Sequence, residues 1–292
     1  MSQVRKAVIL AAGYGTRLLP ATKAQPKEML PLVDKPVIQF AVEEAVQAGI
    51  EQITIVTALG KRAVEDYFDR SRDIEDLLRE KGDNERLEEI LRIPEMADFA
   101  YVRQGEAKGL GHAVLCARHV VGDEPFILYL PDDVILGSPS ASQELLQVYD
   151  RFGKAAIAVE EVPESQVSSY GIVAGEKIDE RTTKLERMIE KPKPTETDSR
   201  LAIVGRYLLM PTVFDAIERT SAGYGGEIQI TDALQQLATS EGMYAYRFTG
   251  ERFDTGRPLG LIKASIHEGL RRADIGPALR EYLRGLDLEE SA

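Results

Sequence analysis

Short, continuously apolar segments alternate along the chain with segments whose apolar residues recur at helical spacing. Residues 7–12 (AVILAA) are apolar throughout and end at a glycine, which is typical of a strand buried on both faces. Residues 36–50 follow helical spacing, with a proline in the first turn and Gly49 at the end. Residues 52–58 form the next apolar run. A strand, a helix and a strand in this order predict a βαβ unit with parallel strands.

The following segment is densely charged. Residues 61–93 carry leucines at helical spacing, which predicts two helices on the outside of the fold, separated at Gly82. After them the pattern predicts strands at residues 99–104 and 125–135, with a helix at residues 111–121 between them. The alternation of strands and helices therefore continues through this half of the chain.

The second half is richer in strands. Predicted strands lie at residues 155–162, 170–178, 182–192, 200–210 and 243–250, and predicted helices at residues 211–219 and 229–240. Together the segments predict a three-layer α/β fold with a mainly parallel central mixed sheet. Because no Pro-, Gly- or Ser-rich linker interrupts the pattern, we expect a single domain over residues 1–292, with a core at 1–257 and a helical tail at 258–292.

The formal net charge of −12 narrows the range of partners. Such a protein lacks the basic field that attracts nucleic acid or an anionic membrane surface, so neither is expected as a partner. The single cysteine, Cys116, excludes an internal disulfide and fits a reducing compartment. No apolar run approaches the roughly 18 residues of a membrane span, and no apolar leader precedes the first strand, so a cytoplasmic location is expected.

A glycine-containing loop follows the first strand. Gly13 and Gly15 let the backbone approach a ligand and point amide N–H groups at phosphate. The loop is not a dinucleotide-binding fingerprint, because Leu18 occupies the position of the third glycine, and it lacks the P-loop pattern as well. An NAD-dependent dehydrogenase is therefore disfavoured.

Arg17, Lys23 and Lys27 lie in the same loop with no acidic residue among them. Three uncompensated cations favour an anionic ligand such as a nucleoside triphosphate. Prolines in the loop block a helix, and we expect them to hold it extended, so that Arg17 and Lys27 reach one ligand from different sides. These prolines are Pro20, Pro26 and Pro31.

Two carboxylates follow the apolar run FILYLP. Asp132 and Asp133 lie where ligands bind in open α/β sheets, beyond the carboxyl end of a strand. Adjacent strand residues point to opposite faces, so only one of the two is expected to face a ligand. One aspartate is enough for a magnesium ion shared with phosphate oxygens. The alternative is an Asp-Asp pair that only begins a turn.

The segment AAGYGTRLLPATKAQPKEMLPLVDKPVIQF resembles the N-terminal signature of bacterial-type UTP-glucose-1-phosphate uridylyltransferases, within the sugar-1-phosphate nucleotidylyltransferases. Further similar motifs follow in order: VRQGEAKGLGHAV, LPDD, EKP, LAIVGRYLL, GGEIQITDAL and FDTG. The resemblance spans residues 6 to about 260. It implies a Rossmann-like nucleotide-diphospho-sugar transferase fold, with residues 1–257 as the catalytic core.

The resemblance also implies which residues bind the nucleotide. The backbone of the first loop, two polar side chains and a later glycine would surround the uracil. These residues are Ala12, Gly13, Glu28, Gln104 and Gly109, and Gly15 of the same loop is also expected to bind the nucleotide. The amide of Gln104 can both donate and accept a hydrogen bond, which a pyrimidine edge requires. Without its neighbouring motif, Gln104 would be read as a surface glutamine.

On the sugar side, the resemblance implies that Glu190 hydrogen-bonds the hydroxyls and that Lys191 holds the sugar phosphate and the reacting α-phosphate. An isolated Glu-Lys pair is more often part of a solvated face, so this assignment depends on the surrounding motifs. Gly171 would let the hexose lie against the backbone, and Ile203 would form a wall of its pocket.

The implied reaction transfers a uridylyl group from UTP to glucose 1-phosphate and yields UDP-glucose and pyrophosphate. The family pattern places the Mg2+ cofactor on Asp132, and Asp254 is a second candidate whose contact with the metal the sequence leaves open. Arg17 and Lys27 would stabilise the departing pyrophosphate, and Lys191 would align the nucleophile. These three cations are the predicted catalytic residues.

Two alternatives stay open at this point. A thymidylyltransferase that uses dTTP would share the fold and the Mg2+ site. A non-catalytic nucleotide-sugar-binding protein would be expected to lack Arg17, Asp132 or Lys191, all of which are present. Sugar specificity does not follow from the sequence, and analogy suggests a homodimer or homotetramer.

Overall fold

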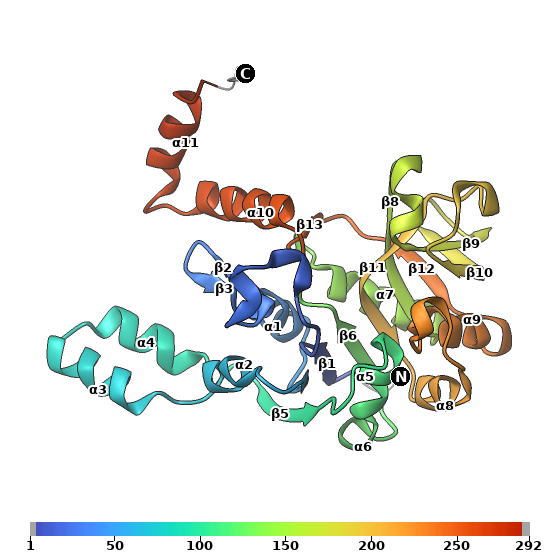
Figure 1. Cartoon of the computed structure of the whole chain (residues 1–292), viewed down its shortest axis with the longest axis horizontal. Helices are drawn as coiled ribbons and strands as arrows, with labels where there is room; N and C mark the ends of the chain where they lie inside the picture. The colour runs from blue at the N-terminus through green and yellow to red at the C-terminus, as the bar shows by residue number, and fades with distance from the viewer. Residues whose placement is uncertain (1–3, 288–292) are drawn as a thin grey trace.

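Residues 4–287, the part of the chain described by this computed structural model, form a central nine-stranded sheet with helices on both faces (Figure 1). Its strands are β1 (Lys6–Leu10), β4 (Gln52–Thr57), β5 (Asp98–Arg103), β6 (Phe126–Tyr129), β8 (Ala156–Glu161), β9 (Gly171–Lys177), β10 (Thr182–Glu190), β11 (Leu201–Leu209) and β12 (Tyr244–Arg247). Their order in the sheet is β5, β4, β1, β6, β11, β8, β12, β10, β9.

The first half of the sheet is parallel. β1 pairs with β4 on one side and with β6 on the other, and β4 pairs with β5. Helix α1 (Val37–Gln47) connects β1 to β4, which confirms the predicted βαβ unit. Because the chain moves to opposite sides of β1, the loops after β1 and β6 separate and leave a crevice between them.

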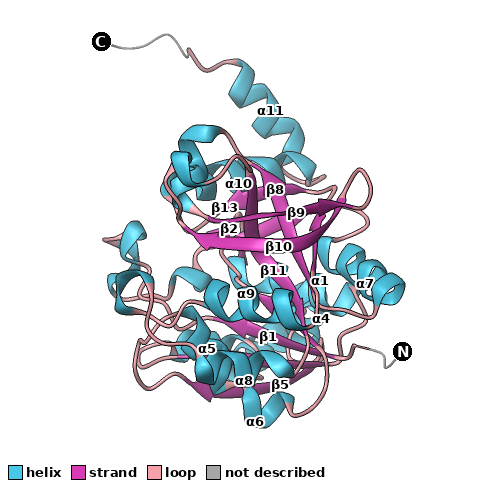
Figure 2. Ribbon diagram, turned by 90° about the vertical axis from the view of Figure 1, so that its right-hand side faces the viewer, coloured by secondary structure: helices cyan, strands magenta, loops and turns pink. Residues whose placement is uncertain are grey.

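The second half is mixed. β11 runs antiparallel to β6 and β8, whereas β8 and β12 are parallel. β9 pairs with both β10 and β11, so this half of the sheet curls back on itself (Figure 2). The predicted mainly parallel character therefore holds for the first half alone, and the sheet as a whole is mixed.

Helices cover the sheet in two layers. Ala7 and Ile9 of β1 pack with α1, α2 (Arg62–Tyr67) and α7 (Ala141–Phe152). Val8 and Leu10 pack with the other layer, made of α5 (Leu110–Cys116), α8 (Thr212–Arg219) and α9 (Ile230–Ser240). Alternate residues of a strand face opposite sides, so one apolar run serves two cores. The predicted three-layer α/β architecture is confirmed.

Two predicted elements are divided. The helix expected at residues 111–121 ends at Cys116, and α6 (Arg118–Val121) follows it. The strand expected at residues 125–135 is interrupted after β6. β7 (Asp133–Leu136) then pairs with β13 (Glu251–Asp254) in a separate antiparallel ribbon. Pro131 has no N–H to donate to a sheet, which accounts for the break.

Helix α7 and strand β13 had no counterpart in the sequence prediction. α7 carries a clear start signal, a capping box in which Ser140 and Gln143 bond each other's backbone N–H. Its buried stripe is interrupted by polar residues, which weakens the helical pattern. β13 spans only four residues, too few for an alternation to stand out.

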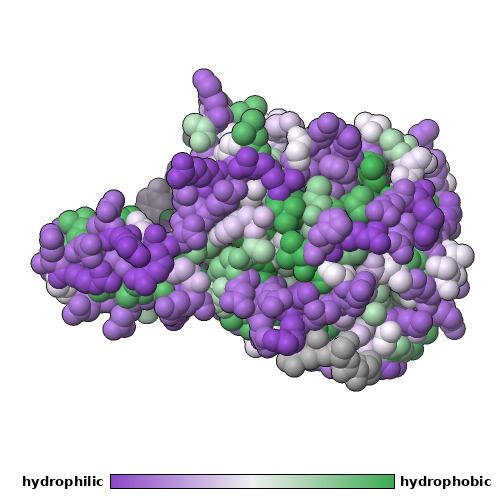
Figure 3. All heavy atoms as spheres, turned by 90° about the horizontal axis from the view of Figure 1, so that it is seen from below, coloured by the Kyte–Doolittle hydropathy of each residue, from purple (hydrophilic) through white to green (hydrophobic). Residues whose placement is uncertain are grey.

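The charged segment forms an arm that projects from the body. α3 (Arg72–Lys81) and α4 (Asn84–Arg92) lie side by side, and Gly82 ends α3 with a φ of 69°, which confirms the predicted break. Hydrophilic side chains cover most of the arm (Figure 3). The prediction of two helices was nevertheless wrong, because α2 precedes the arm as a third helix.

The proline-containing loop after β1 is not extended, contrary to the prediction. It folds into three short 3-10 turns, η1 (Thr16–Leu18), η2 (Ala21–Lys23) and η3 (Lys27–Met29). A small ribbon of β2 (Pro31–Leu32) and β3 (Lys35–Pro36) follows. Proline prevents a continuous α-helix but is compatible with the first position of a turn, so the loop is compact.

The predicted helical tail consists of α10 (Pro258–Arg271) and α11 (Gly276–Arg284). α10 packs on β2 and β13, where Ala264 is buried against Phe253 and Leu32. α11 contacts α10 and projects away from the body (Figure 1). The end of the predicted tail, residues 288–292, lies outside the described residues, and the single-domain organisation stays a prediction. Among residues 4–287, no helix is both long and apolar enough to span a membrane.

Candidate active site

Two adjoining cavities open at the crevice between β1 and β6. The first cavity has a volume of about 520 Å³ and the second about 200 Å³. The first is lined by the loop after β1, by residues 104–113 and by Glu227. The second is lined by the second half of the sheet and by residues near Asp254. Leu110, Leu130 and Asp132 line both cavities, so the two form one continuous site.

Most of the predicted nucleotide-binding residues line the first cavity. They are Ala12, Gly13, Gly15, Gln104 and Gly109. Gly15 has a φ of 69°, and the Thr22 hydroxyl donates to its carbonyl at 2.8 Å. A Cβ on Gly15 would lie 3.1 Å from Cβ of Lys27, so glycine is favoured here by both conformation and space.

The opposite wall is fixed by Gln104 and Gly109. The Gln104 amide Nε2 donates to the Gly109 carbonyl at 3.2 Å and lies 3.0 Å from Nδ1 of His112. Gly109 has a φ of 104°, and a Cβ there would approach the Ile228 carbonyl to 2.8 Å. The glycine therefore permits close contact between the start of α5 and the loop before α9.

Glu28 does not line either cavity, unlike the other predicted nucleotide contacts. It is only 1% exposed, and its Oε2 accepts a hydrogen bond from Lys61 Nζ at 2.8 Å. Its Oε1 is buried and has no hydrogen-bond partner among the described residues. Burial raises the pKa of Glu28 above its ordinary value, and the positive charge of Lys61 only partly opposes this.

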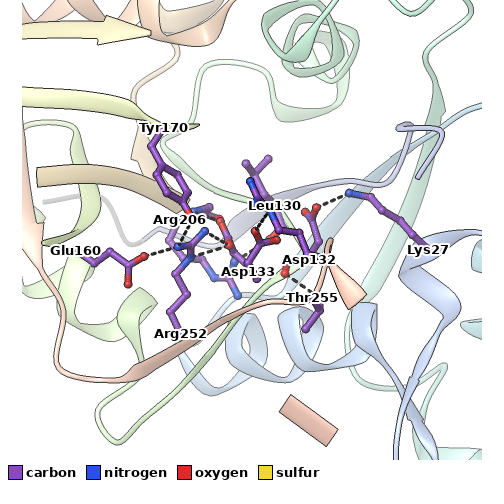
Figure 4. Close-up of polar contacts among 12 residues, drawn as sticks. Lys27, Leu130, Asp132, Asp133, Glu160, Tyr170, Arg206, Arg252 and Thr255 are labelled. Atoms are coloured by element: carbon purple, nitrogen blue, oxygen red, sulfur yellow. Dashed lines mark hydrogen bonds and ion pairs between the residues drawn. The ribbon is translucent and has the colours of Figure 1, made fainter. Parts of the chain in front are cut away.

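Lys27 and Asp132 form an ion pair at the junction of the cavities (Figure 4). Burial alone would raise the pKa of Asp132, but the charge and hydrogen bond of Lys27 outweigh it and lower that pKa. The backbone N–H and hydroxyl of Thr255 both donate to the Asp132 carbonyl at 2.8 Å. Arg17 lines the second cavity, whereas Lys23 is exposed and lines neither.

Asp133 is engaged on the side away from Lys27, but it lines the second cavity together with Asp132, contrary to the expectation that only one of the two faces a ligand. Its Oδ2 accepts from the Gly205 N–H at 2.9 Å, and its Oδ1 accepts from Nε of Arg252 at 2.7 Å. The expectation assumed that the two aspartates are adjacent residues of one strand. In the structure Asp132 lies in a turn, and Asp133 is the first residue of β7. Burial raises the pKa of Asp133, and Arg252 opposes this effect.

Asp132 and Asp254 face a common space above Gly256. A Cβ on Gly256 would lie 2.7 Å from Oδ2 of Asp132 and 3.1 Å from Oδ1 of Asp254. Two carboxylate oxygens around a space that a side chain would fill suit a divalent cation completed by phosphate and water. Within residues 4–287 no cluster of three or more acidic, histidine or cysteine ligands occurs, so any cation here would need ligands from a substrate.

The three predicted sugar-binding residues lie together in the second cavity. A Cβ on Gly171 would lie 3.1 Å from Cδ1 of Ile203 and 3.2 Å from Oε2 of Glu190. The hydroxyl of Thr231 donates to the same Glu190 oxygen at 2.7 Å. The Gly171 position thus offers bare backbone beside an oriented carboxylate.

Lys191 lies beside this group but lines neither cavity. Its φ of 46° is rare for a residue with a Cβ, and its N–H donates to the Tyr170 carbonyl at 3.0 Å. Its Nζ lies 3.5 Å from Oε1 of Glu190. This unusual backbone conformation occurs directly after Glu190, the last residue of β10.

Sequence reasoning missed Arg252 and Thr231, which both line the second cavity. A signal for Arg252 was available: Phe253 is buried between Arg252 and Asp254, so the two charged residues share one face of β13. Thr231 lies in the first turn of α9, and no local pattern indicated its contact with Glu190.

The nucleotidyl transferase family matches residues 6–269 of the chain. UTP–glucose-1-phosphate uridylyltransferase 2 of Staphylococcus saprophyticus is 46% identical over 288 residues, covering 99% of this chain and 100% of the relative. The UTP-bound UGPase from Acinetobacter baumannii has a TM-score of 0.90 at 40% identity, with 97% of this chain and 100% of that chain covered.

A solved UDP-glucose pyrophosphorylase complexed with UDP-glucose has a TM-score of 0.84 at 43% identity. The match covers 92% of this chain and 100% of that chain. The family match, the full-length identity and the structural similarity agree with the resemblance drawn from the motifs. The chain belongs to the nucleotidyl transferase family and, within it, to the UTP–glucose-1-phosphate uridylyltransferases.

Proposed function

We propose that this protein transfers the uridylyl group of UTP to glucose 1-phosphate, with UDP-glucose and pyrophosphate as products. One observation carries the proposal: the residues predicted for the nucleotide, except Glu28, and those predicted for the sugar line two cavities that meet at Asp132. A transferase that joins two substrates needs such an arrangement, because the reacting groups must meet at a shared point.

UTP would occupy the first cavity. The Gly13–Gly15 loop would admit the nucleotide, and we assign recognition of the uracil edge to the Gln104 amide, which lines this cavity. Lys27 lines this cavity and Arg17 the neighbouring one, so both cations adjoin the junction where the triphosphate would lie. We assign them the stabilisation of the departing pyrophosphate, whose negative charge grows as the bond breaks.

A divalent cation, Mg2+ in our proposal, would be held by Asp132 and Asp254 at the space above Gly256. When bound, it would neutralise charge on the phosphates that meet there. The charge and hydrogen bond of Lys27 lower the pKa of Asp132, which favours the ionised carboxylate that a cation ligand needs. Lys27 is close enough to Asp132 to exchange this carboxylate for a phosphate when substrates enter.

Glucose 1-phosphate would occupy the second cavity, with Glu190 and Gly171 against the hexose and Ile203 as its wall. Its phosphate oxygen is already deprotonated near neutral pH, so the attack on the α-phosphorus needs no general base. The chain's contribution is alignment and charge neutralisation, and we assign Lys191 the task of holding the nucleophile in line. A direct displacement without a covalent enzyme intermediate follows.

The reaction can be tested by incubating the purified protein with Mg2+, glucose 1-phosphate and one of UTP, dTTP, CTP, ATP or GTP. Pyrophosphate release is measured with and without EDTA. We expect EDTA-sensitive release that is fastest with UTP. Faster release with dTTP would identify a thymidylyltransferase, and no release from folded protein would favour a non-catalytic nucleotide-sugar-binding protein.

Location and assembly complete the proposal. We place the protein in the cytoplasm, because its single cysteine suits a reducing compartment. Its net charge of −12 also argues against binding to an anionic membrane surface. We also propose a homodimer or homotetramer, which sedimentation velocity would distinguish from a monomer.

A further inference from the structure

Arg252 is the centre of a buried polar network beside the space above Gly256 (Figure 4). Its Nε donates to Oδ1 of Asp133 at 2.7 Å, and its Nη1 contacts Glu160 and lies 3.4 Å from the Tyr170 hydroxyl. The side chain of Arg252 is only 7% exposed, although it lines the second cavity. Neither Arg252 nor Asp133 has a role in the reaction outlined above.

The ribbon of β7 and β13 explains why Asp133 needs a cationic partner. Asp133 and Asp254 are direct neighbours across this ribbon, and Asp132 precedes Asp133 in the chain. Like charges opposite each other on adjacent strands destabilise a sheet. Arg252 lies two residues before Asp254 and therefore on the same face of β13, where it neutralises Asp133.

We propose that Arg252 is a positioning residue that withholds Asp133 from a bound divalent cation. The proposal rests on the proposed function for the place of the cation. Both oxygens of Asp133 are engaged, one by Arg252 and the other by the Gly205 N–H. Among residues 4–287, Asp132 and Asp254 are then the carboxylates at the space above Gly256.

The number of carboxylates matters for catalysis. A third carboxylate would hold the cation more tightly and occupy coordination positions that phosphate oxygens need. It would also add negative charge where two phosphates must approach each other. By neutralising Asp133, Arg252 keeps the candidate cation site open to substrate.

The same contacts connect the cation side to the sugar side. Asp133 holds Gly205 within the irregular part of β11 that follows Ile203. The guanidinium carbon of Arg252 lies 5.1 Å from the ring centroid of Tyr170, which directly precedes Gly171. Loss of Arg252 should therefore raise KM for glucose 1-phosphate more than KM for UTP.

The test uses Mn2+ alone, titrated into the full chain and followed by the EPR signal of the free ion. Arg252→Gln is expected to bind Mn2+ about 10- to 100-fold more tightly than the wild type, because the released Asp133 adds a third charged ligand to Asp132 and Asp254. The double variant Arg252→Gln/Asp133→Asn is expected to return to wild-type affinity. Glu160→Gln removes a contact on the other side of Arg252 and is the matched control, with wild-type Mn2+ affinity.

Equal or weaker Mn2+ binding by Arg252→Gln would overturn the proposal, as would a double variant that binds as tightly as Arg252→Gln. If Arg252→Gln does not fold, Asp133→Asn decides: wild-type Mn2+ affinity supports the proposal, and a loss of Mn2+ binding overturns it. Absence of uridylyl transfer by the wild type would refute the proposed reaction and leave this Mn2+ comparison intact.

Discussion

Lys191 combines a rare backbone conformation with a charge beside the candidate sugar carboxylate. Its φ is 46°, and its Nζ lies 3.5 Å from Oε1 of Glu190. Residues held in sparsely populated conformations cluster at functional sites, where the surrounding structure over-determines them. The backbone here is held by the bond from its N–H to the Tyr170 carbonyl. This conformation and the motif resemblance both favour a functional role for Lys191.

Lys191→Ala should lower kcat by orders of magnitude with little change in stability. Alanine keeps the Cβ and hence the same backbone strain, so the variant removes only the charged side chain that we assign to the reacting phosphate. Steady-state kinetics and thermal unfolding measure the two effects. Lys193→Ala is the control, since Lys193 is an exposed lysine close in sequence to which no role in the site is assigned. Retention of more than about a tenth of wild-type kcat would contradict the assignment of Lys191.

Glu28 illustrates a residue whose role its neighbours in space determine. Motif resemblance assigned it to the uracil, whereas the structure buries it against Lys61 and outside the cavity lining. Lys61 follows β4 and lies 33 residues further along the chain, and no local pattern connects the two. The motif resemblance could mark Glu28 as a candidate site residue, but it could not predict the ion pair with Lys61 in which Glu28 is buried.

At the level of elements, the α3–α4 arm depends on charge rather than on a core. Glu75 of α3 is 3% exposed. It accepts hydrogen bonds from Arg70, which precedes α3, and from Arg79, which lies one turn after Glu75 in the same helix. The hydrogen bond from Arg70 is the main cause of its lowered pKa of about 2, and Arg79 adds to it. These contacts hold the arm's helix to the segment before it.

Glu75→Gln should lower the thermal midpoint at neutral pH. A lowered folded pKa means that Glu75 stabilises the protein above its unfolded pKa, and that this contribution is lost as pH falls toward about 2. The difference between variant and wild type should therefore be full above about pH 5 and shrink below it. Thermal unfolding over this range measures it. Glu80→Gln, an exposed residue of the same helix, is the control. A difference that does not depend on pH would contradict this explanation.

Elements with a strong period were predictable, and those that depend on partners were not. The apolar runs of β1 and β4 could be predicted from the sequence alone, because a strand covered on both faces must be apolar throughout. Pro131 accounts for the break after β6, whereas the pairing of Asp133–Leu136 with β13 joins segments more than 100 residues apart in sequence. Pairing of this kind has no signature in either segment alone.

For the molecule as a whole, a buried ion pair connects β11, in the second half of the sheet, to helix α1, which joins β1 to β4 in the first half. Arg206 of β11 is 1% exposed, and its Nε and Nη2 donate to Oε2 of Glu44 in α1 at 2.9 Å and 2.8 Å. The other carboxylate oxygen of Glu44 accepts from the N–H and hydroxyl of Ser142 in α7. The pair thus fixes α1, α7 and β11 relative to one another.

Arg206→Met should destabilise the protein by about 3–5 kcal/mol, because it leaves the Glu44 carboxylate buried without its charge partner. Arg206→Met/Glu44→Gln removes both charges and should recover part of this loss. Urea denaturation of the two variants measures the free energies of unfolding. The same stability for the single and double variants would show that packing, rather than the unpaired charge, accounts for the loss.

The sequence by itself determined the fold class, the βαβ unit of β1, α1 and β4, and the family, because apolar periodicity and dense local motifs survive without tertiary context. It also placed Gly171, Glu190 and Ile203, which the structure brings together. Only the tertiary structure showed that Asp133 pairs with Arg252 and Glu28 with Lys61. It alone showed that two cavities meet at Asp132. The physical reason is that buried charges are satisfied by partners distant in sequence, and that a cavity exists only where separate segments enclose it.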